Sequence, residues 1–199
     1  MFDTEIKEDP KTVRIAWIKV DRLMKQEILD KLINMPSDTE TVDLSGNKFA
    51  LSEPAFLMEM ARAIRHPIKN LDLSFNELGQ MSLHHLLDFI GALPAANNLN
   101  FCHNSFGLLA KEDILRVSDA INPSAELVNF SRNKFDQLGE DFLVNLINRH
   151  PERITITNDL QSRRHKKALQ DWLVSSSLTE KTVGSTAKSY FPAVSRIKN

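Results

Sequence analysis

Four stretches of the chain repeat one pattern at a nearly fixed spacing: TVDLSGNKF (residues 41–49), NLDLSFNEL (70–78), NLNFCHNSF (98–106) and LVNFSRNKF (127–135). Aligned, they read apolar-x-apolar-x-x-Asn-x-apolar, and their first residues are 29, 28 and 29 positions apart. A period of this size, with a strand-like stretch and an Asn in every unit, indicates a solenoid of stacked repeats. Four matches in register make this prediction specific for the fold.

The recurring Asn has a physical reason. A strand alternates its two faces, so the two apolar residues of each stretch point into the solenoid together. The chain must then turn, and a buried backbone group without a partner is costly. An Asn side chain offers one acceptor and two donors, so a stacked ladder can satisfy its own turn and the neighbouring one. We therefore expect a structural role for the four ladder residues, Asn47, Asn76, Asn104 and Asn133.

Between these stretches, apolar residues recur at helical spacing. The second unit illustrates it with Leu83, Leu86, Leu87 and Ile90, three or four positions apart on one helical face. We expect Ser52 to cap the start of the first of these helices. Strands alternating with helices in short units predict an α/β fold with parallel strands.

The repeat pattern extends backwards in a weaker form. Val13 and Ile15 lie 29 residues before the corresponding apolar pair of the first full unit, but Ile18 occupies the Asn position. Because end units of solenoids are expected to be atypical, we interpret residues 11–35 as an N-terminal capping repeat. The full repeats then begin near residues 40, 69, 97 and 126.

The other end is also atypical. Ile154 and Ile156 form a further apolar pair, and Asp159 stands in the Asn position. We interpret residues 153–175 as a C-terminal cap, so that the repeat domain covers 1–175. Residues 176–199 are rich in Ser, Thr and Lys, and we expect them to form a flexible tail.

Composition narrows the function classes. The chain has 199 residues, 42% of them apolar, and a formal net charge of −1, so charge gives no general attraction to nucleic acid or acidic lipid. The N-terminus lacks the apolar core of a signal peptide, and no stretch has membrane-span length. The single Cys102 cannot form an internal disulfide, which suits a reducing compartment. We expect a cytoplasmic protein without membrane insertion.

These repeats resemble the ribonuclease-inhibitor-like class of leucine-rich repeat proteins, over roughly residues 11–175. The resemblance implies a right-handed horseshoe solenoid with short parallel strands on the concave face and helices on the convex face. It also implies that the concave face binds a partner protein. Short arrays with a Ser/Thr-rich tail are similar to leucine-rich repeat effectors that intracellular bacteria deliver into host cells, which would place the chain in a host-cell cytosol.

Strand alternation predicts which side chains face a partner. Between the inward pairs lies one polar residue per unit, and Ser45, Ser74, Cys102 and Ser131 are expected to flank this row outward. An exposed Phe75 would be a typical interface anchor, although it could also pack on the neighbouring turn. The predicted partner-binding residues are Asp43, Asp72, Phe75, Glu77, Asn100, His103, Asn129, Arg132 and Lys134.

Two other functions stay open beside protein binding. An enzyme would need converging acid, base or nucleophile groups, and the sequence has no HExxH, CxxC, GxSxG or phosphate-binding loop. A Cys102–His103 dyad would need the two side chains to converge from a strand edge. The basic run RRHKK at 163–167 could contact phosphates, although a solvated capping helix explains it as well. We expect no cofactor, no metal and no small-molecule substrate.

Overall fold

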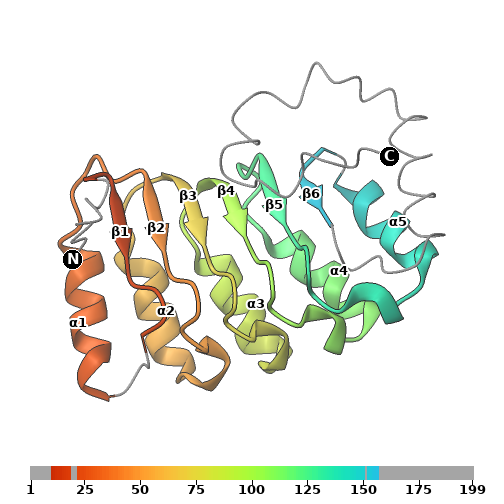
Figure 1. Ribbon diagram of the computed structural model, residues 1–199, viewed down its shortest axis with the longest axis horizontal. Helices are drawn as coiled ribbons and strands as arrows, with labels where there is room; N and C mark the ends of the chain where they lie inside the picture. Colours follow the sequence, from red (N-terminus) through yellow and green to blue (C-terminus); the bar gives the residue numbers. More distant parts are fainter. Residues whose placement is uncertain (1–9, 19–21, 151, 157–199) are drawn as a thin grey trace, which may run out of the picture.

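The computed structural model describes residues 10–18, 22–150 and 152–156, and in this part of the chain six strands form one parallel sheet in sequence order (Figure 1). The strands are β1 (Thr12–Arg14), β2 (Thr41–Asp43), β3 (Ile68–Asp72), β4 (Ala96–Asn100), β5 (Leu127–Asn129) and β6 (Ile154–Thr155). The inward residue Val13 is in register with Val42, which is in register with Leu71, and the row continues to Ile154. Each step of the row is one sequence period.

One helix follows each of the first five strands and packs on the helix of the next unit. These helices are α1 (Arg22–Ile33), α2 (Pro54–Ala63), α3 (Leu83–Ala92), α4 (Lys111–Ala120) and α5 (Glu140–Arg149). A parallel strand-helix-strand connection is right-handed almost without exception. The result is the predicted α/β leucine-rich repeat solenoid, with the strands on one face and the helices on the other.

Short 3-10 helices occupy a place that the sequence pattern did not predict. They are η1 (Phe49–Leu51), η2 (Leu78–Gln80), η3 (Phe106–Leu108) and η4 (Phe135–Gln137). They follow the Asn turn directly, so the prediction that Ser52 caps α2 was wrong. Ser52 instead ends η1, its backbone N–H donating to the Phe49 carbonyl, and Glu53 precedes α2 with Pro54 in the first turn.

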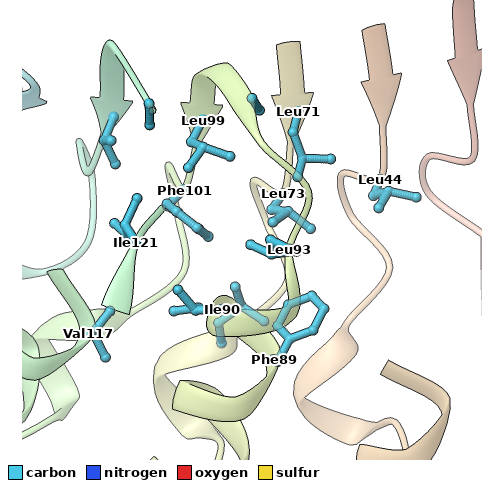
Figure 2. Packing of buried hydrophobic residues seen from close by; sticks show 14 of the residues in the cluster. Leu44, Leu71, Leu73, Phe89, Ile90, Leu93, Leu99, Phe101, Val117 and Ile121 are labelled. Atoms are coloured by element: carbon cyan, nitrogen blue, oxygen red, sulfur yellow. The ribbon is translucent and has the colours of Figure 1, made fainter. Parts of the chain in front are cut away.

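The core lies between sheet and helices. Inward strand residues such as Leu71, Leu73 and Leu99 meet Phe89 and Ile90 of α3, all of them buried (Figure 2). The later units use aromatic rings in the same positions, and the rings of Phe101 and Phe130 stack with centroids 5.6 Å apart. Burial of such side chains is the main stabilising term of the fold.

The Asn ladder forms as predicted. The Asn76 Nδ2 donates to the carbonyls of Leu44 at 2.9 Å and Leu73 at 3.0 Å, and its Oδ1 accepts from the Asn47 backbone N–H at 2.8 Å. Each ladder side chain is buried and joins its own unit to the preceding one. No backbone group of these turns then depends on water.

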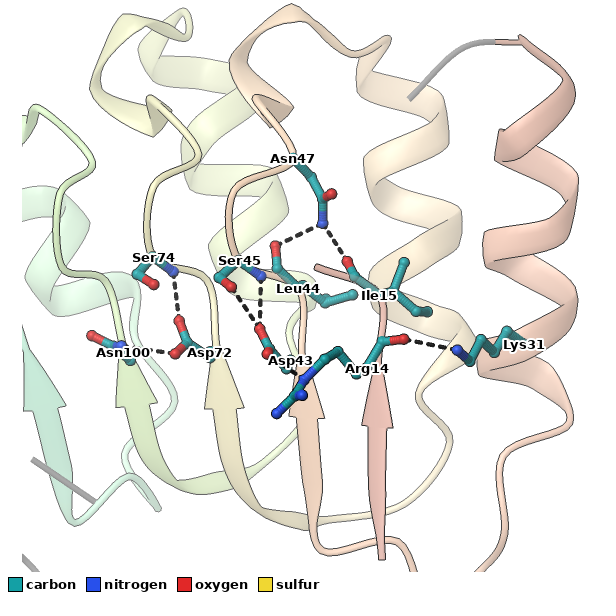
Figure 3. A network of polar contacts seen from close by, with 10 residues as sticks. All are labelled: Arg14, Ile15, Lys31, Asp43, Leu44, Ser45, Asn47, Asp72, Ser74 and Asn100. Atoms are coloured by element: carbon teal, nitrogen blue, oxygen red, sulfur yellow. Dashed lines mark hydrogen bonds and ion pairs between the residues drawn. The ribbon is translucent and has the colours of Figure 1, made fainter. Parts of the chain in front are cut away.

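The first unit shows why its Asn position can hold Ile18. The Ile18 backbone N–H donates to Asn47 Oδ1 at 2.8 Å, while Asn47 Nδ2 donates to the carbonyl of Ile15 at 2.5 Å (Figure 3). The second unit thereby supplies the amide contacts that an Asn in the first unit would make to its own turn. Asp159, in the corresponding position at the other end, lies outside the described residues, as do 157–199 as a whole.

Candidate functional site

A row of polar side chains crosses the strands on the face opposite the helices. The register places Arg14, Asp43, Asp72, Asn100 and Asn129 side by side, and we call these five residues the central row. Arg14 Nε donates to Asp43 Oδ2 at 3.2 Å, Asn100 Nδ2 donates to Asp72 Oδ2 at 3.0 Å, and Asn129 Nδ2 donates to Asn100 Oδ1 at 3.1 Å (Figure 3). The structure thus brings the four predicted members together and adds Arg14.

The central row also shapes the chain after each strand. Asp43 Oδ1 accepts from both the backbone N–H and the hydroxyl of Ser45, and Asp72 Oδ1 accepts from the Ser74 N–H at 2.8 Å. Asn100 and Asn129 make the same contact two residues onward. These turns draw the following residues inward, so the prediction that they face outward was wrong: Ser45, Ser74 and Ser131 are buried and Cys102 is half-buried.

A second polar row runs beside the first. Asn70 Nδ2 donates to Thr41 Oγ1 at 3.0 Å, and Asn98 Nδ2 donates to Asn70 Oδ1 at 2.7 Å. The two rows line a shallow hollow of about 240 Å³ over β1 to β4, bordered by Thr12, Arg14, Thr41, Asp43, Asn70, Leu71, Asp72, Asn98 and Asn100. Its lining offers hydrogen bonds, with amide donors and carboxylate acceptors already held in place.

Charged residues link three units where the strands begin. The Glu40 carboxylate accepts from Lys11 Nζ at 2.6 Å and from Lys69 Nζ at 2.7 Å. Hydrogen bonds from these two ammonium groups lower the pKa of Glu40 from 4.5 to about 2. Glu40 is therefore ionised at neutral pH and joins the first three units electrostatically.

The most unusual feature lies at the opposite ends of the strands, where one position per unit has a left-handed backbone. These residues are Trp17, Gly46, Phe75, His103 and Arg132, with φ angles of 58°, 72°, 59°, 57° and 59°, and we call them the rim stripe. A positive φ is uncommon outside Gly, and for a bulky residue it is an outlier. Such a backbone costs on the order of 1–3 kcal/mol per residue and persists only where its surroundings hold it.

Hydrogen bonds to the next unit hold the rim stripe. The backbone N–H of Trp17 donates to the Ser45 carbonyl at 2.8 Å, and the N–H of Phe75 donates to the Cys102 carbonyl at 3.0 Å. The N–H of His103 donates in the same way. The strained backbone is thus built into every unit of the array.

The side chains of the rim stripe form one continuous surface. The Trp17 and Phe75 rings lie 5.3 Å apart because Gly46, between them, has no side chain. A Cβ at Gly46 would lie only 2.3 Å from Trp17 Cδ2. Phe75 stacks on the His103 ring at 4.1 Å, and His103 Nε2 contacts Arg132 Nη1 at 3.5 Å.

The surface is accessible and partly charged. Trp17 is 67% exposed and Phe75 is 41% exposed. Partial burial and the neighbouring Arg132 cation lower the pKa of His103, so this ring is neutral at pH 7 and can accept a hydrogen bond through Nε2. The stripe therefore runs from an aromatic end to a cationic end.

The two remaining predicted site residues form a row of their own. Glu77 and Lys134, with Lys48 and Ser105, occupy the left-handed position that follows each Asn, with φ between 53° and 63°. Glu77 accepts a hydrogen bond from Gln80 Nε2 at 3.2 Å. These residues border the rim stripe in sequence but belong to a different position of the repeat.

Two members of the surface were missed by the sequence analysis. Trp17 lies 29 residues before Gly46, and Arg14 lies 29 residues before Asp43. The period alone could have found both, because the first unit follows it without a gap. The mismatch at Ile18 hid them, since that unit was interpreted only as a cap.

Other chemistry can be checked in the described ranges. Among residues 10–18, 22–150 and 152–156, no group of three His, Cys, Asp or Glu side chains could hold a metal ion. None of the described helices combines the length and the apolar character needed to cross a bilayer. The basic run at 163–167 lies outside these ranges.

The fold is similar to that of the leucine-rich repeat-containing protein LegL7 from Legionella pneumophila, with a TM-score of 0.53. Sequence identity is 16%, and the match covers 73% of this chain and 55% of that one. No protein-family model and no curated protein matches the chain. At this identity the likeness supports the leucine-rich repeat fold.

Proposed function

We propose that the chain is a non-catalytic module that binds a partner protein through the concave face of its sheet. In this proposal the central row and the rim stripe together form the contact surface. The observation that carries it is the exposed aromatic pair of Trp17 and Phe75, stacked on a backbone with positive φ. The leucine-rich repeat fold of the chain suggests the same kind of function, since such solenoids present extended binding surfaces.

Energetics support the stripe as the anchor. Interfaces concentrate their binding energy in Trp, Tyr and Arg side chains that become buried on association, and Trp17 and Arg132 are of these types. Trp17 is mostly solvent-exposed in the free chain, so its contribution to the free energy of unfolding is small compared with what a partner could gain by covering it. A strained, exposed aromatic residue is better explained by binding than by stability.

The central row supports the rest of the surface. Its amides and carboxylates hold one another through hydrogen bonds of 3.0–3.2 Å, so little side-chain entropy remains to be lost when a partner binds. The carboxylates of Asp43 and Asp72 suit a basic or amide-rich partner surface on this side.

Capture from cytosolic extract tests the proposal. The wild-type chain is compared with Asp72→Arg on the concave face and with Glu59→Arg, an equal charge reversal on the exposed side of α2. We expect one set of proteins to be retained by wild type and by the Glu59 variant and to be lost with the Asp72 variant. Loss with the Glu59 variant alone would move the site to the helices, and retention of nucleic acid in place of protein would favour the 163–167 segment.

The proposal extends to location: the protein acts in a cytosol, delivered there from a bacterium into its host cell. Support comes from the resemblance to bacterial leucine-rich repeat effectors and from the fold shared with a Legionella pneumophila protein. A translocation reporter fused to the chain should give a signal in host cells only when the bacterium has an intact secretion apparatus. An equal signal without that apparatus would contradict delivery.

A further inference from the structure

The rim stripe changes its chemistry from one end to the other. Trp17 and Phe75 offer apolar aromatic surface, His103 is stacked between them and the charged end, and Arg132 ends the row with a guanidinium. Among the described residues, no carboxylate lies within ion-pair distance of Arg132. An Arg fork is best satisfied by a carboxylate, which accepts two parallel hydrogen bonds.

The repeat fixes the spacing of these two chemistries. Adjacent parallel strands lie about 4.8 Å apart, so the two steps from Phe75 to Arg132 span roughly 10 Å. An extended chain rises about 3.3 Å per residue and covers the same distance in three residues. The aromatic end and the guanidinium therefore match side chains three positions apart in an extended segment.

We propose that the rim stripe binds an extended segment of the partner that carries an apolar side chain and, three positions away, an Asp or Glu. The apolar side chain packs on Trp17 and Phe75, and the carboxylate accepts from Arg132. This inference rests on the proposed function and goes beyond it by naming the chemistry that the stripe recognises. The neutral His103 ring keeps the middle of the stripe flat and adds no second positive charge.

Packing within the chain does not explain the stripe equally well. A ladder that served only stability would bury its largest ring, whereas Trp17 is 67% exposed. Gly46 keeps the gap between Trp17 and Phe75 open, and its absent side chain lets the two rings form one platform. The cationic end would also need an internal carboxylate partner in a purely structural ladder.

Tryptophan fluorescence of the full chain tests the proposal. The chain has two Trp residues, and the substitution Trp172→Phe leaves Trp17 as the reporter. The probe is the peptide acetyl-Gly-Phe-Ser-Ser-Asp-Gly-amide, with matched peptides in which Asn replaces Asp or in which Phe and Asp are adjacent. We expect a blue shift on titration with the probe and about tenfold weaker binding of both matched peptides, since a charge-assisted contact is lost.

Protein variants separate the two ends of the stripe. Arg132→Gln should remove the preference for Asp over Asn, and Phe75→Ala should weaken all three peptides. Arg62→Gln, which removes the same charge from the exposed side of α2, should leave the titrations unchanged. Equal binding of the Asp and Asn peptides, or no shift at millimolar probe, would overturn the inference. If a partner is still captured through the Asp72 face in that case, the proposed function stands without it.

Discussion

Asn76 makes clear why one polar residue recurs in every unit. Its amide nitrogen faces the carbonyls of Leu44, Leu73 and Ser74, while its oxygen accepts from the Asn47 N–H. Donor and acceptor are both required, because the turn presents carbonyls on one side and an amide on the other. The side chain is fully buried, so water cannot replace it.

The first prediction compares two substitutions of Asn76. Asn76→Ala should lower the free energy of unfolding by about 1–3 kcal/mol, because it leaves the buried Asn47 N–H without a partner. Asn76→Asp keeps that acceptor but turns a carboxylate oxygen toward two carbonyls, so at pH 7 it should cost more than the alanine. Urea unfolding at pH 7 and pH 5 measures both, and protonation should make the Asp variant less unstable at pH 5. An Asp variant as stable as wild type would contradict the ladder.

The second prediction concerns Ser105, which has a φ of 60°. A left-handed non-Gly residue costs roughly 1–2 kcal/mol, and Gly loses about 0.5–1 kcal/mol more than Ala in unfolded-state entropy. Ser105→Gly should therefore stabilise the chain by about 0.5–1 kcal/mol, measured as a shift of the denaturant midpoint. Ser118→Gly in the helix α4 serves as a control and should destabilise it.

At the scale of elements, the 3-10 helices stack as closely as the strands. The N–H of Gly107 donates to the Asn133 carbonyl at 2.8 Å, and a Cβ on Gly107 would lie 2.3 Å from the Lys134 carbonyl oxygen. The corresponding residue of η1 is Ala50, whose hydrogen bond to the Asn76 carbonyl is longer at 3.1 Å. The glycine thus permits the tighter stacking of the later units.

The third prediction follows from that contact. Gly107→Ala should destabilise the chain by about 1–3 kcal/mol, because backbone must move to admit the methyl group. Ala substitution at Gly91, which has open space around its Cβ position on α3, should be neutral or stabilising. Thermal unfolding of the two variants distinguishes them, and equal melting temperatures would mean that the stacking is looser than described.

The strands were largely predictable because their signal is redundant. Two apolar residues and one Asn mark each strand, and four units confirm one another, so Val42, Leu71, Leu99 and Val128 fall in register as expected. The 3-10 helices are only three residues long and show no periodicity of their own. The misplaced Ser52 follows from that gap, since the chain begins a different helix before α2.

At the scale of the whole molecule, charge couples units that are distant in sequence. Glu40 joins Lys11 and Lys69, each 29 residues away, across the first three strands. Its folded-state pKa of about 2 lies below the ordinary 4.5, so the folded chain binds fewer protons than the unfolded chain between these values. The stability that Glu40 contributes is present above pH 4.5 and is lost as the pH falls toward 2.

The fourth prediction uses that sign. Wild type should lose more stability than Glu40→Gln when the pH is lowered from 6 to 2.5, because the variant has no carboxylate to protonate. Thermal unfolding at both pH values gives the difference between the two proteins. An identical acid dependence of both would show that the two lysines do not interact with Glu40 in solution.

The candidate site was predictable in part. The central row follows from strand alternation, which is why Asp43, Asp72, Asn100 and Asn129 lie together as expected. The contacts of the rim stripe depend on backbone conformation, since a positive φ turns Phe75 toward both His103 and Trp17. Periodicity reports which residues share a position, but it does not report the direction that a turn gives to their side chains.

The fifth prediction tests the binding surface most directly, through the affinity for a captured partner measured across three variants. Phe75→Ala and Arg132→Ala should each weaken binding by about 1–3 kcal/mol, since aromatic and Arg anchors dominate interfaces. Glu59→Ala on α2 should leave the affinity unchanged, and all three variants should keep the far-ultraviolet circular dichroism of wild type. Weaker binding confined to the Glu59 variant, with the two stripe variants binding like wild type, would contradict the account.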